Sequence, residues 1–146
     1  MTTPRMTDEV RAWLQGFPSR GLVDHLGIDV IEAEPARVVA TMSVEQRVHQ
    51  PYGLLHGGAS VALAESVASI AASLNIDRAR FMAVGLEINA NHLRPVRDGV
   101  VTAVGTPVHV GRSTQVWEIR ISDARERLVC ISRCTLAVVP LEREPA

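Results

Sequence analysis

The strongest constraint on the fold of this chain is an alanine-rich, apolar segment between residues 57 and 75. Apolar residues recur there at helical spacing and cover nearly every side of the predicted helix: Ala59, Val61, Ala62, Leu63, Ala64, Val67, Ala68, Ile70, Ala71, Ala72 and Leu74. A helix that is apolar nearly all round is typical of a protein interior. The sequence therefore predicts a long buried helix with the rest of the chain packed around it.

Segments with the period of a β-strand flank this helix on both sides. Before it, residues 28–34 and 37–44 alternate apolar and polar side chains around Pro35, as two antiparallel strands joined by a tight turn do. After it come four more strand-like segments: 82–94, 99–109, 114–122 and 127–139. This order predicts an α+β fold, in which an antiparallel sheet wraps around one long central helix.

The length of 146 residues, 47% of them hydrophobic, suits a single core rather than two domains. Residues 1–20 are expected to form a lead-in with one short peripheral helix, in which Thr7 caps residues 8–14. Residues 21–140 are expected to form the folded domain. Residues 141–146 are expected to be a frayed tail.

The charge distribution argues against two classes of partner. The formal net charge is −1, so the basic surface that nucleic acids or anionic membranes attract is missing. The uncharged stretch from residue 66 to 76 is shorter than the roughly 20 residues of a membrane-spanning helix. Early charges at Arg5, Asp8, Glu9 and Arg11 leave no room for a secretory signal. We therefore expect a cytoplasmic protein with neither nucleic-acid nor membrane partners.

Cys130 and Cys134 lie in a segment that alternates like a strand. Neither is surrounded by histidine or aspartate at metal-ligand spacing. Packing in the core is their expected role, and the sequence predicts neither a metal nor a cofactor.

Glu65 is the single formal charge between Arg47 and Asp77, and it falls in the middle of the apolar helix. Burying an isolated carboxylate costs several kcal/mol unless the group is paired or neutralised. One interpretation is structural: the side chain points to solvent or pairs with an arginine such as Arg94 or Arg112. The other is that the cost is tolerated because Glu65 is catalytic. Ser69, one turn further along, lies on the same helical face and is placed to bind the carboxylate or a water beside it.

The loop that enters the helix supplies a second candidate group. His56, Gly57 and Gly58 place free N–H groups and the positive end of the helix dipole at one point, which suits a carbonyl oxygen that gains negative charge during a reaction. Gly57 and Glu65 are separated by about 12 Å at 1.5 Å per residue. One substrate carbonyl therefore touches both only if they come from different subunits, and we expect at least a homodimer with its site at a two-fold interface.

Three ordered blocks carry a family resemblance: residues 50–58 followed by Glu65, residues 87–95, and Gly111-Arg112-Ser113 followed by residues 117–119. In these blocks the chain resembles the hotdog-fold acyl-coenzyme A thioesterases. The similarity is to the branch of the Arthrobacter-type 4-hydroxybenzoyl-CoA thioesterase, which includes enzymes of enterobactin proofreading and of 1,4-dihydroxy-2-naphthoyl-CoA hydrolysis.

The resemblance implies hydrolysis of an acyl- or aroyl-CoA by a homodimer or homotetramer. It places the catalytic carboxylate at Glu65, which acts as nucleophile or as general base. The Gly57 N–H would polarise the carbonyl, Gln50 and His56 would position the substrate, and Ser69 would assist Glu65. The expected contacts with the acyl group or coenzyme A come from Val84, Asn91, His92, Arg94, Gly111, Arg112 and Ser113.

Two other functions remain open at this level. A hotdog module that only binds acyl-CoA as a sensor would gain nothing from a buried carboxylate, and no helix-turn-helix segment accompanies the domain. A dehydratase of 3-hydroxyacyl thioesters also uses a histidine and a carboxylate, but in another arrangement. The sequence does not identify the acyl group, which is aromatic or aliphatic.

Overall fold

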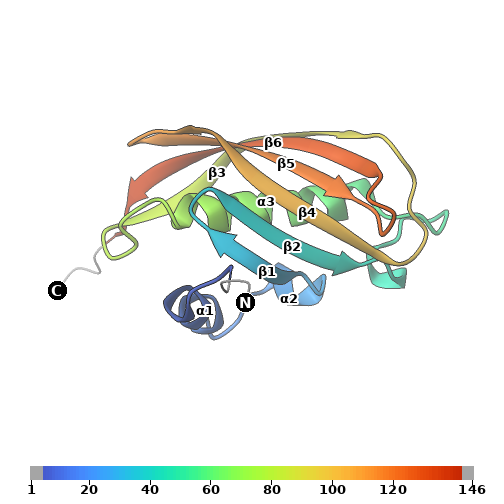
Figure 1. Cartoon of the computed structure of the whole chain (residues 1–146), viewed down its shortest axis with the longest axis horizontal. Helices are drawn as coiled ribbons and strands as arrows, with labels where there is room; N and C mark the ends of the chain where they lie inside the picture. The colour runs from blue at the N-terminus through green and yellow to red at the C-terminus, as the bar shows by residue number, and fades with distance from the viewer. Residues whose placement is uncertain (1–4, 143–146) are drawn as a thin grey trace.

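The computed structural model describes residues 5–142. A single antiparallel sheet of six strands has the order β1-β2-β4-β5-β6-β3. It curves over the long helix α3 (Gly57–Ser73), as Figure 1 shows. The strands are β1 (Asp29–Glu34), β2 (Arg37–Ser43), β3 (Phe81–His92), β4 (Val100–Val110), β5 (Thr114–Ser122) and β6 (Leu128–Pro140). The predicted α+β layout is confirmed.

The core lies between the concave side of this sheet and α3. Leu63, Ala64, Val67 and Ala68 are fully buried against inward-facing strand residues such as Trp117. Alanine and valine let the helix lie close to the sheet, because short side chains keep the two backbones near each other. The apolar pattern of the sequence is therefore the pattern of this contact.

Two buried polar side chains of β5, Gln115 and Trp117, form hydrogen bonds that connect the sheet to α3. The Trp117 Nε1–H donates to Gln115 Oε1 at 2.9 Å, and Gln115 Nε2 donates to the Ala72 carbonyl at 3.3 Å. Both side chains are fully buried, so these bonds satisfy groups that would otherwise cost free energy. They link β5 to the last turn of α3.

The predicted helix is not buried on every side. Val61, Ala62, Glu65, Ser66, Ser69 and Ile70 are only half-buried. They form one face of α3 that points away from the sheet. An apolar helical pattern does not show whether a face is covered by the sheet of the same chain or by a ligand or a second subunit.

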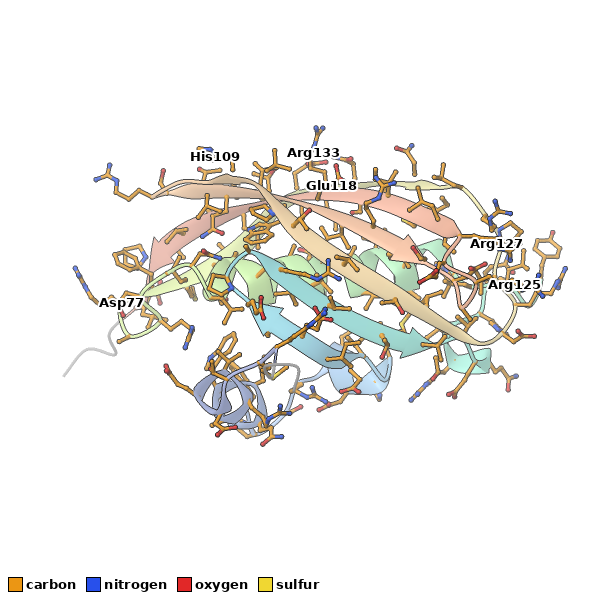
Figure 2. The ribbon with its side chains drawn as sticks, in the orientation of Figure 1. Asp77, His109, Glu118, Arg125, Arg127 and Arg133 are labelled. Atoms are coloured by element: carbon orange, nitrogen blue, oxygen red, sulfur yellow. The ribbon has the colours of Figure 1, made fainter. Side chains whose placement is uncertain are left out.

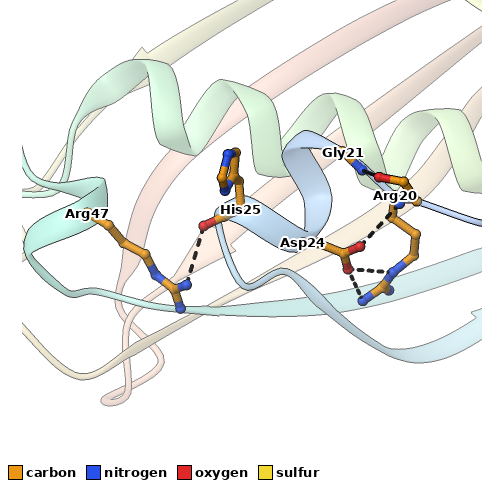
Figure 3. A network of polar contacts seen from close by, with 6 residues as sticks. Arg20, Gly21, Asp24, His25 and Arg47 are labelled. Atoms are coloured by element: carbon orange, nitrogen blue, oxygen red, sulfur yellow. Dashed lines mark hydrogen bonds and ion pairs between the residues drawn. The ribbon is translucent and has the colours of Figure 1, made fainter.

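Two short helices were not predicted: α2 (Leu22–His25) and the 3-10 turn η1 (Gln46–Val48). Figure 3 shows how side chains stabilise α2. Asp24 Oδ1 accepts from Arg20 Nε at 2.8 Å, and Arg47 donates to the His25 carbonyl at 3.3 Å. These tertiary and local bonds, rather than helical periodicity, define so short an element.

The predicted helix at residues 8–14 is confirmed as α1 (Asp8–Gln15), and Thr7 caps it by accepting from the Val10 N–H at 3.2 Å. At the other end, the Leu141 N–H donates to the Arg80 carbonyl at 2.9 Å. The expected tail falls mostly on residues 143–146, which lie outside the described residues, as do residues 1–4. The predicted boundaries at residues 20 and 140 stay predictions.

The two edges of the sheet differ. Along β1, the Ala33 N–H donates to the Arg5 carbonyl at 2.9 Å. Along β3, which has 12 residues, no backbone segment within residues 5–142 pairs with the outer side. A long unpaired edge strand is a template for pairing with another chain.

The outer face of the sheet, opposite α3, carries polar side chains that include His109, Glu118 and Arg133 (Figure 2). The same view places Asp77 at one end of the molecule and Arg125 and Arg127 at the other. In the part of the chain that the structure describes, no helix is long and apolar enough to cross a membrane.

Both cysteines are buried in the core, as predicted. Burial, together with the negative charges of Glu65 and Glu87, raises the pKa of Cys134 from 9.0 to about 12. The unfolded chain loses this proton at lower pH than the folded one, so stability falls as pH rises from 9 to 12. Urea unfolding across this range is expected to show a smaller fall for Cys134→Ala than for wild type, and equal falls would contradict the prediction.

Candidate active site

The loop before α3 is held in place by backbone bonds on both sides. The Leu55 N–H donates to the Val96 carbonyl at 2.7 Å, and the His56 N–H donates to the Val48 carbonyl at 2.8 Å. Gln50 Oε1 accepts from the Tyr52 N–H. The Gln50 side chain is thereby fixed with its amide nitrogen left for a ligand.

His56 is the N-cap of α3, and its Nδ1 accepts from the Gly58 N–H at 2.8 Å. An imidazole nitrogen that accepts an N–H bond carries no proton, so neutral His56 holds its proton on Nε2. The exposed Nε2–H is therefore available as a donor, which agrees with the positioning role that the family resemblance implies.

Gly57 provides the free donor at the start of α3. The N–H groups of Gly58, Ala59 and Ser60 all have partners in His56, while the Gly57 N–H has none within residues 5–142. It sits at the positive end of a helix of 17 residues. An oxygen that develops negative charge would be stabilised here.

A pocket of about 350 Å³ opens beside this donor. Gly57, Gln50, His92 and Arg94 all line it. The His92 ring lies against Gly57, because a Cβ at that position would stand 2.9 Å from His92 Nε2. The structure thus brings together four of the predicted site residues, and we call this the donor pocket.

Glu65 opens onto a different depression, which we call the Glu65 groove. This groove, of about 510 Å³, runs along the half-buried face of α3 and is lined by Glu65, Ser66, Ser69 and their neighbours. It shares no lining residue with the donor pocket. Gly57 and Glu65 lie eight residues apart on the continuous helix α3, which keeps them about 12 Å apart within one chain.

Nothing in the described part of the chain pairs with Glu65. It forms no ion pair with Arg94, Arg112 or another described base, and no hydrogen bond. The arginine-paired interpretation is therefore wrong for the single chain. The carboxylate is half-buried and faces a groove. It is therefore available to bind a substrate or water, as catalytic carboxylates in clefts are.

The serines around Glu65 differ in their bonding. The Ser66 and Ser73 hydroxyls donate back to the carbonyls of Ala62 and Ser69, at 2.7 and 2.8 Å. The Ser69 hydroxyl makes no such bond among residues 5–142, and it lines the groove beside Glu65. Ser69 is the serine of this face that remains available to a substrate or water.

Gly85 is a site residue that the sequence reasoning missed. A Cβ at this position would lie 2.3 Å from Glu65 Oε1, so any other residue would push the carboxylate out of its present position. The pairing of β3 with β6 also shifts register between Gly85 and Glu87. An isolated glycine inside a strand pattern was the available signal, because it marks a bulge or a close approach.

Gly85→Ala is expected to lower kcat by about 10- to 100-fold, because displacing a catalytic group by roughly 1 Å can cost that much. The matched control is Gly85→Ala in a Glu65→Asp background, where the shorter side chain no longer meets the added methyl group. There the loss should be at most about twofold. Steady-state kinetics of the four proteins test this, and additive losses would contradict it.

The remaining predicted binding residues lie apart in one chain. Asn91 and Val84 lie on β3, Asn91 toward the His92 end. Gly111, Arg112 and Ser113 form the turn between β4 and β5, where the Ser113 carbonyl accepts from the Val138 N–H at 2.9 Å. Val138 pairs with Ala83, near the first residue of β3. This turn lies level with Ala83 and the donor pocket lies at His92. Along β3 the two are therefore about 30 Å apart, at about 3.3 Å per residue.

Comparison with known proteins identifies the family. The model of the thioesterase superfamily matches residues 52–130. A 1,4-dihydroxy-2-naphthoyl-CoA hydrolase of Listeria monocytogenes is 51% identical over 118 residues, which cover 81% of this chain and 95% of that one. A solved thioesterase of Haemophilus influenzae superposes with a TM-score of 0.86 at 45% identity, covering 97% of this chain and 98% of that one.

A thioesterase of Staphylococcus aureus is also similar, at 40 to 42% identity and TM-scores of 0.80 and 0.81, over 82% of this chain and 98 to 99% of that one. It was solved as two variants, in which alanine replaces a glutamine or a glutamate fifteen positions apart. Gln50 and Glu65 have the same spacing here. The chain belongs to the thioesterase superfamily, has the hotdog fold and is a thioester hydrolase.

Proposed function

We propose that the protein hydrolyses an acyl- or aroyl-CoA to the free acid and coenzyme A, at two equivalent sites in a homodimer. The observation that carries this proposal is the half-buried Glu65 carboxylate, which has no partner among residues 5–142 and faces a groove. A group of this kind costs stability, and such a cost is typical of carboxylates that take part in a reaction.

The proposed chemistry divides between the two half-sites. The Gly57 N–H and the α3 dipole polarise the thioester carbonyl. Glu65 either takes a proton from a water that adds to the carbonyl carbon, or adds to that carbon itself and is released by water afterwards. In both routes the C–S bond breaks, coenzyme A leaves as the thiol after gaining a proton, and water supplies the second oxygen of the acid. Ser69 orients the water beside Glu65.

The free edge of β3 supports a two-subunit site. If β3 pairs with its copy in the antiparallel sense, the first residues of one strand lie against the last residues of the other. This places the turn of Arg112 and Ser113 in one subunit near His92 and Arg94 of its partner. Residues at opposite ends of a single chain then surround one coenzyme A, whose phosphates suit the two arginines.

Subunit mixing tests the shared site. Glu65→Gln and Gly57→Pro each disable one half-site, so a mixed dimer holds one site with both wild-type groups and one with neither. Equimolar unfolding and refolding together should restore about a quarter of wild-type activity, because half the dimers are mixed and each has one intact site. Mixing either variant with itself is the control. Recovery no greater than this control would contradict a site between subunits.

We also propose that dimers associate into a homotetramer, as the family resemblance implies. Light scattering on the purified protein measures the mass directly. Because a two-fold site requires pairs, a mass of one subunit under assay conditions would contradict both the tetramer and the shared site.

The test of the activity is the release of free coenzyme A, followed with a thiol reagent. Benzoyl, hydroxybenzoyl, phenylacetyl and medium-chain acyl thioesters are supplied to wild type and Glu65→Ala in parallel. Turnover by wild type and its loss in the variant support the proposal. Binding without thiol release would favour an acyl-CoA sensor, and conversion of a 3-hydroxyacyl thioester without thiol release would favour a dehydratase.

A further inference from the structure

A second depression lies directly beyond the Glu65 groove, beneath α1. It has a volume of about 310 Å³, and we call it the α1 chamber. Its walls come from α1, the following loop, α2, β1 and the outer face of α3, and they include Trp13, Phe17, Arg20, Ser69, Ile70 and Ser73. Val23, Ser69 and Ile70 also line the Glu65 groove. The two depressions are therefore continuous.

The chemistry of the α1 chamber suits an apolar group. Two aromatic rings and several aliphatic side chains face it. Among residues 5–142, Arg20 is its one charged lining residue, and it is paired with Asp24 at 2.6 Å. Glu65, Ser69 and Ser73 follow one another along α3, each about one turn or about 6 Å of helix rise from the next. A thioester whose carbonyl lies at Glu65 would place its more distant carbon atoms in this chamber.

We propose that the α1 chamber binds the apolar end of the acyl group and that Trp13 and Phe17 limit its length. This proposal rests on the function proposed above. The occupant is a medium-chain or bicyclic acyl group, since it must extend from Glu65 past Ile70. Trp13 and Phe17 precede the matched family segment, which begins at residue 52, whereas Ser69, Ile70 and Ser73 lie within it.

The attachment of α1 fits this role. None of its residues is buried. It is held by the Arg78 guanidinium, 4.7 Å from the centre of the Trp13 ring and 3.5 Å from Glu9, and Trp13 contacts Phe17 edge-on at 6.0 Å. The aromatic wall is positioned by its own contacts and does not form part of the core, so a side chain in it can be changed without opening the sheet.

The test compares kcat/KM for acetyl-, octanoyl-, dodecanoyl- and 2-naphthoyl-CoA. Trp13→Ala enlarges the chamber and should raise the ratio of dodecanoyl to octanoyl turnover at least about tenfold. Ser73→Phe fills it from α3 and should lower octanoyl and naphthoyl turnover at least about tenfold. Acetyl-CoA does not reach the chamber, so both variants should hydrolyse it within about twofold of wild type. Gln15→Ala, on α1 but outside the chamber, is the matched control and should keep the wild-type profile.

If the enzyme hydrolyses these thioesters but neither Trp13→Ala nor Ser73→Phe changes its preference among them, the inference is overturned. The proposed function would still stand in that case. A second readout does not need turnover. S-octyl-CoA, a thioether that cannot be hydrolysed, should change the fluorescence of Trp13, and the change should be lost in Trp13→Phe, which retains the buried Trp117. Binding that alters Trp13 emission without any hydrolysis would support the chamber and reject the proposed function. An unchanged emission on binding would reject the chamber.

Discussion

Replacing Glu65 with glutamine is expected to lower kcat for thioester hydrolysis by at least about 100-fold, the loss that follows removal of a principal acid–base group. Glutamine has the shape of glutamate, so it fits the space left by Gly85 and keeps the packing of α3. It can neither accept a proton from water nor attack the carbonyl. The measurement is coenzyme A release with the best thioester of the panel.

The fold should not suffer from this change. Glu65 makes no ion pair or hydrogen bond within residues 5–142, so the variant loses no bond and no longer carries a half-buried charge. The pKa of Cys134 should fall toward its ordinary value, because Glu65 is one of the charges that raise it. Glu34→Gln, which removes an exposed carboxylate at the end of β1, is the matched control. A Glu65→Gln enzyme with near wild-type kcat would show that the catalyst lies elsewhere.

Replacing Gly57 with proline is expected to lower kcat by about 100- to 1,000-fold, the cost of losing one donor to a developing oxyanion. Proline removes the free N–H without breaking the helix, because the first position of a helix tolerates proline well. It also adds a Cβ close to His92, and the alanine variant below controls for this atom. The preceding residue already has the extended conformation that proline demands, with φ −68° and ψ 131° at His56.

Gly57→Ala distinguishes the loss of the N–H donor from the crowding that an added Cβ causes. Alanine adds the same Cβ, which would stand 2.9 Å from the His92 ring, but it keeps the N–H. His92 is exposed and can move, so the alanine variant should lose at most about tenfold. Equal losses in the alanine and proline variants would attribute the effect to crowding of His92 and contradict the role of the donor.

The secondary structure of this protein follows closely from local sequence. The alternation of residues 114–122 predicted β5 to its ends, and Pro35 marked the turn between β1 and β2, because strand period and turn chemistry are properties of neighbouring residues. Helix α2 was not predicted. Its four residues are too few to show a helical period, and the helix depends on bonds to Arg20 and Arg47. Glu65 was conspicuous for a similar local reason: a charge within an apolar helix is visible without a structure.

What surrounds Glu65 was decided by tertiary structure alone. No local pattern states that Gly85 lies against its carboxylate, that the Gly57 N–H is the donor left free at the start of α3, or that Trp13 and Ile70 line one chamber. These contacts join residues far apart in the chain, and they exist because the curved sheet fixes where α3 lies. The sequence by itself determined the elements and the family blocks, because these depend on periodicity and residue type; the geometry of the site depends on packing, which only the folded chain defines.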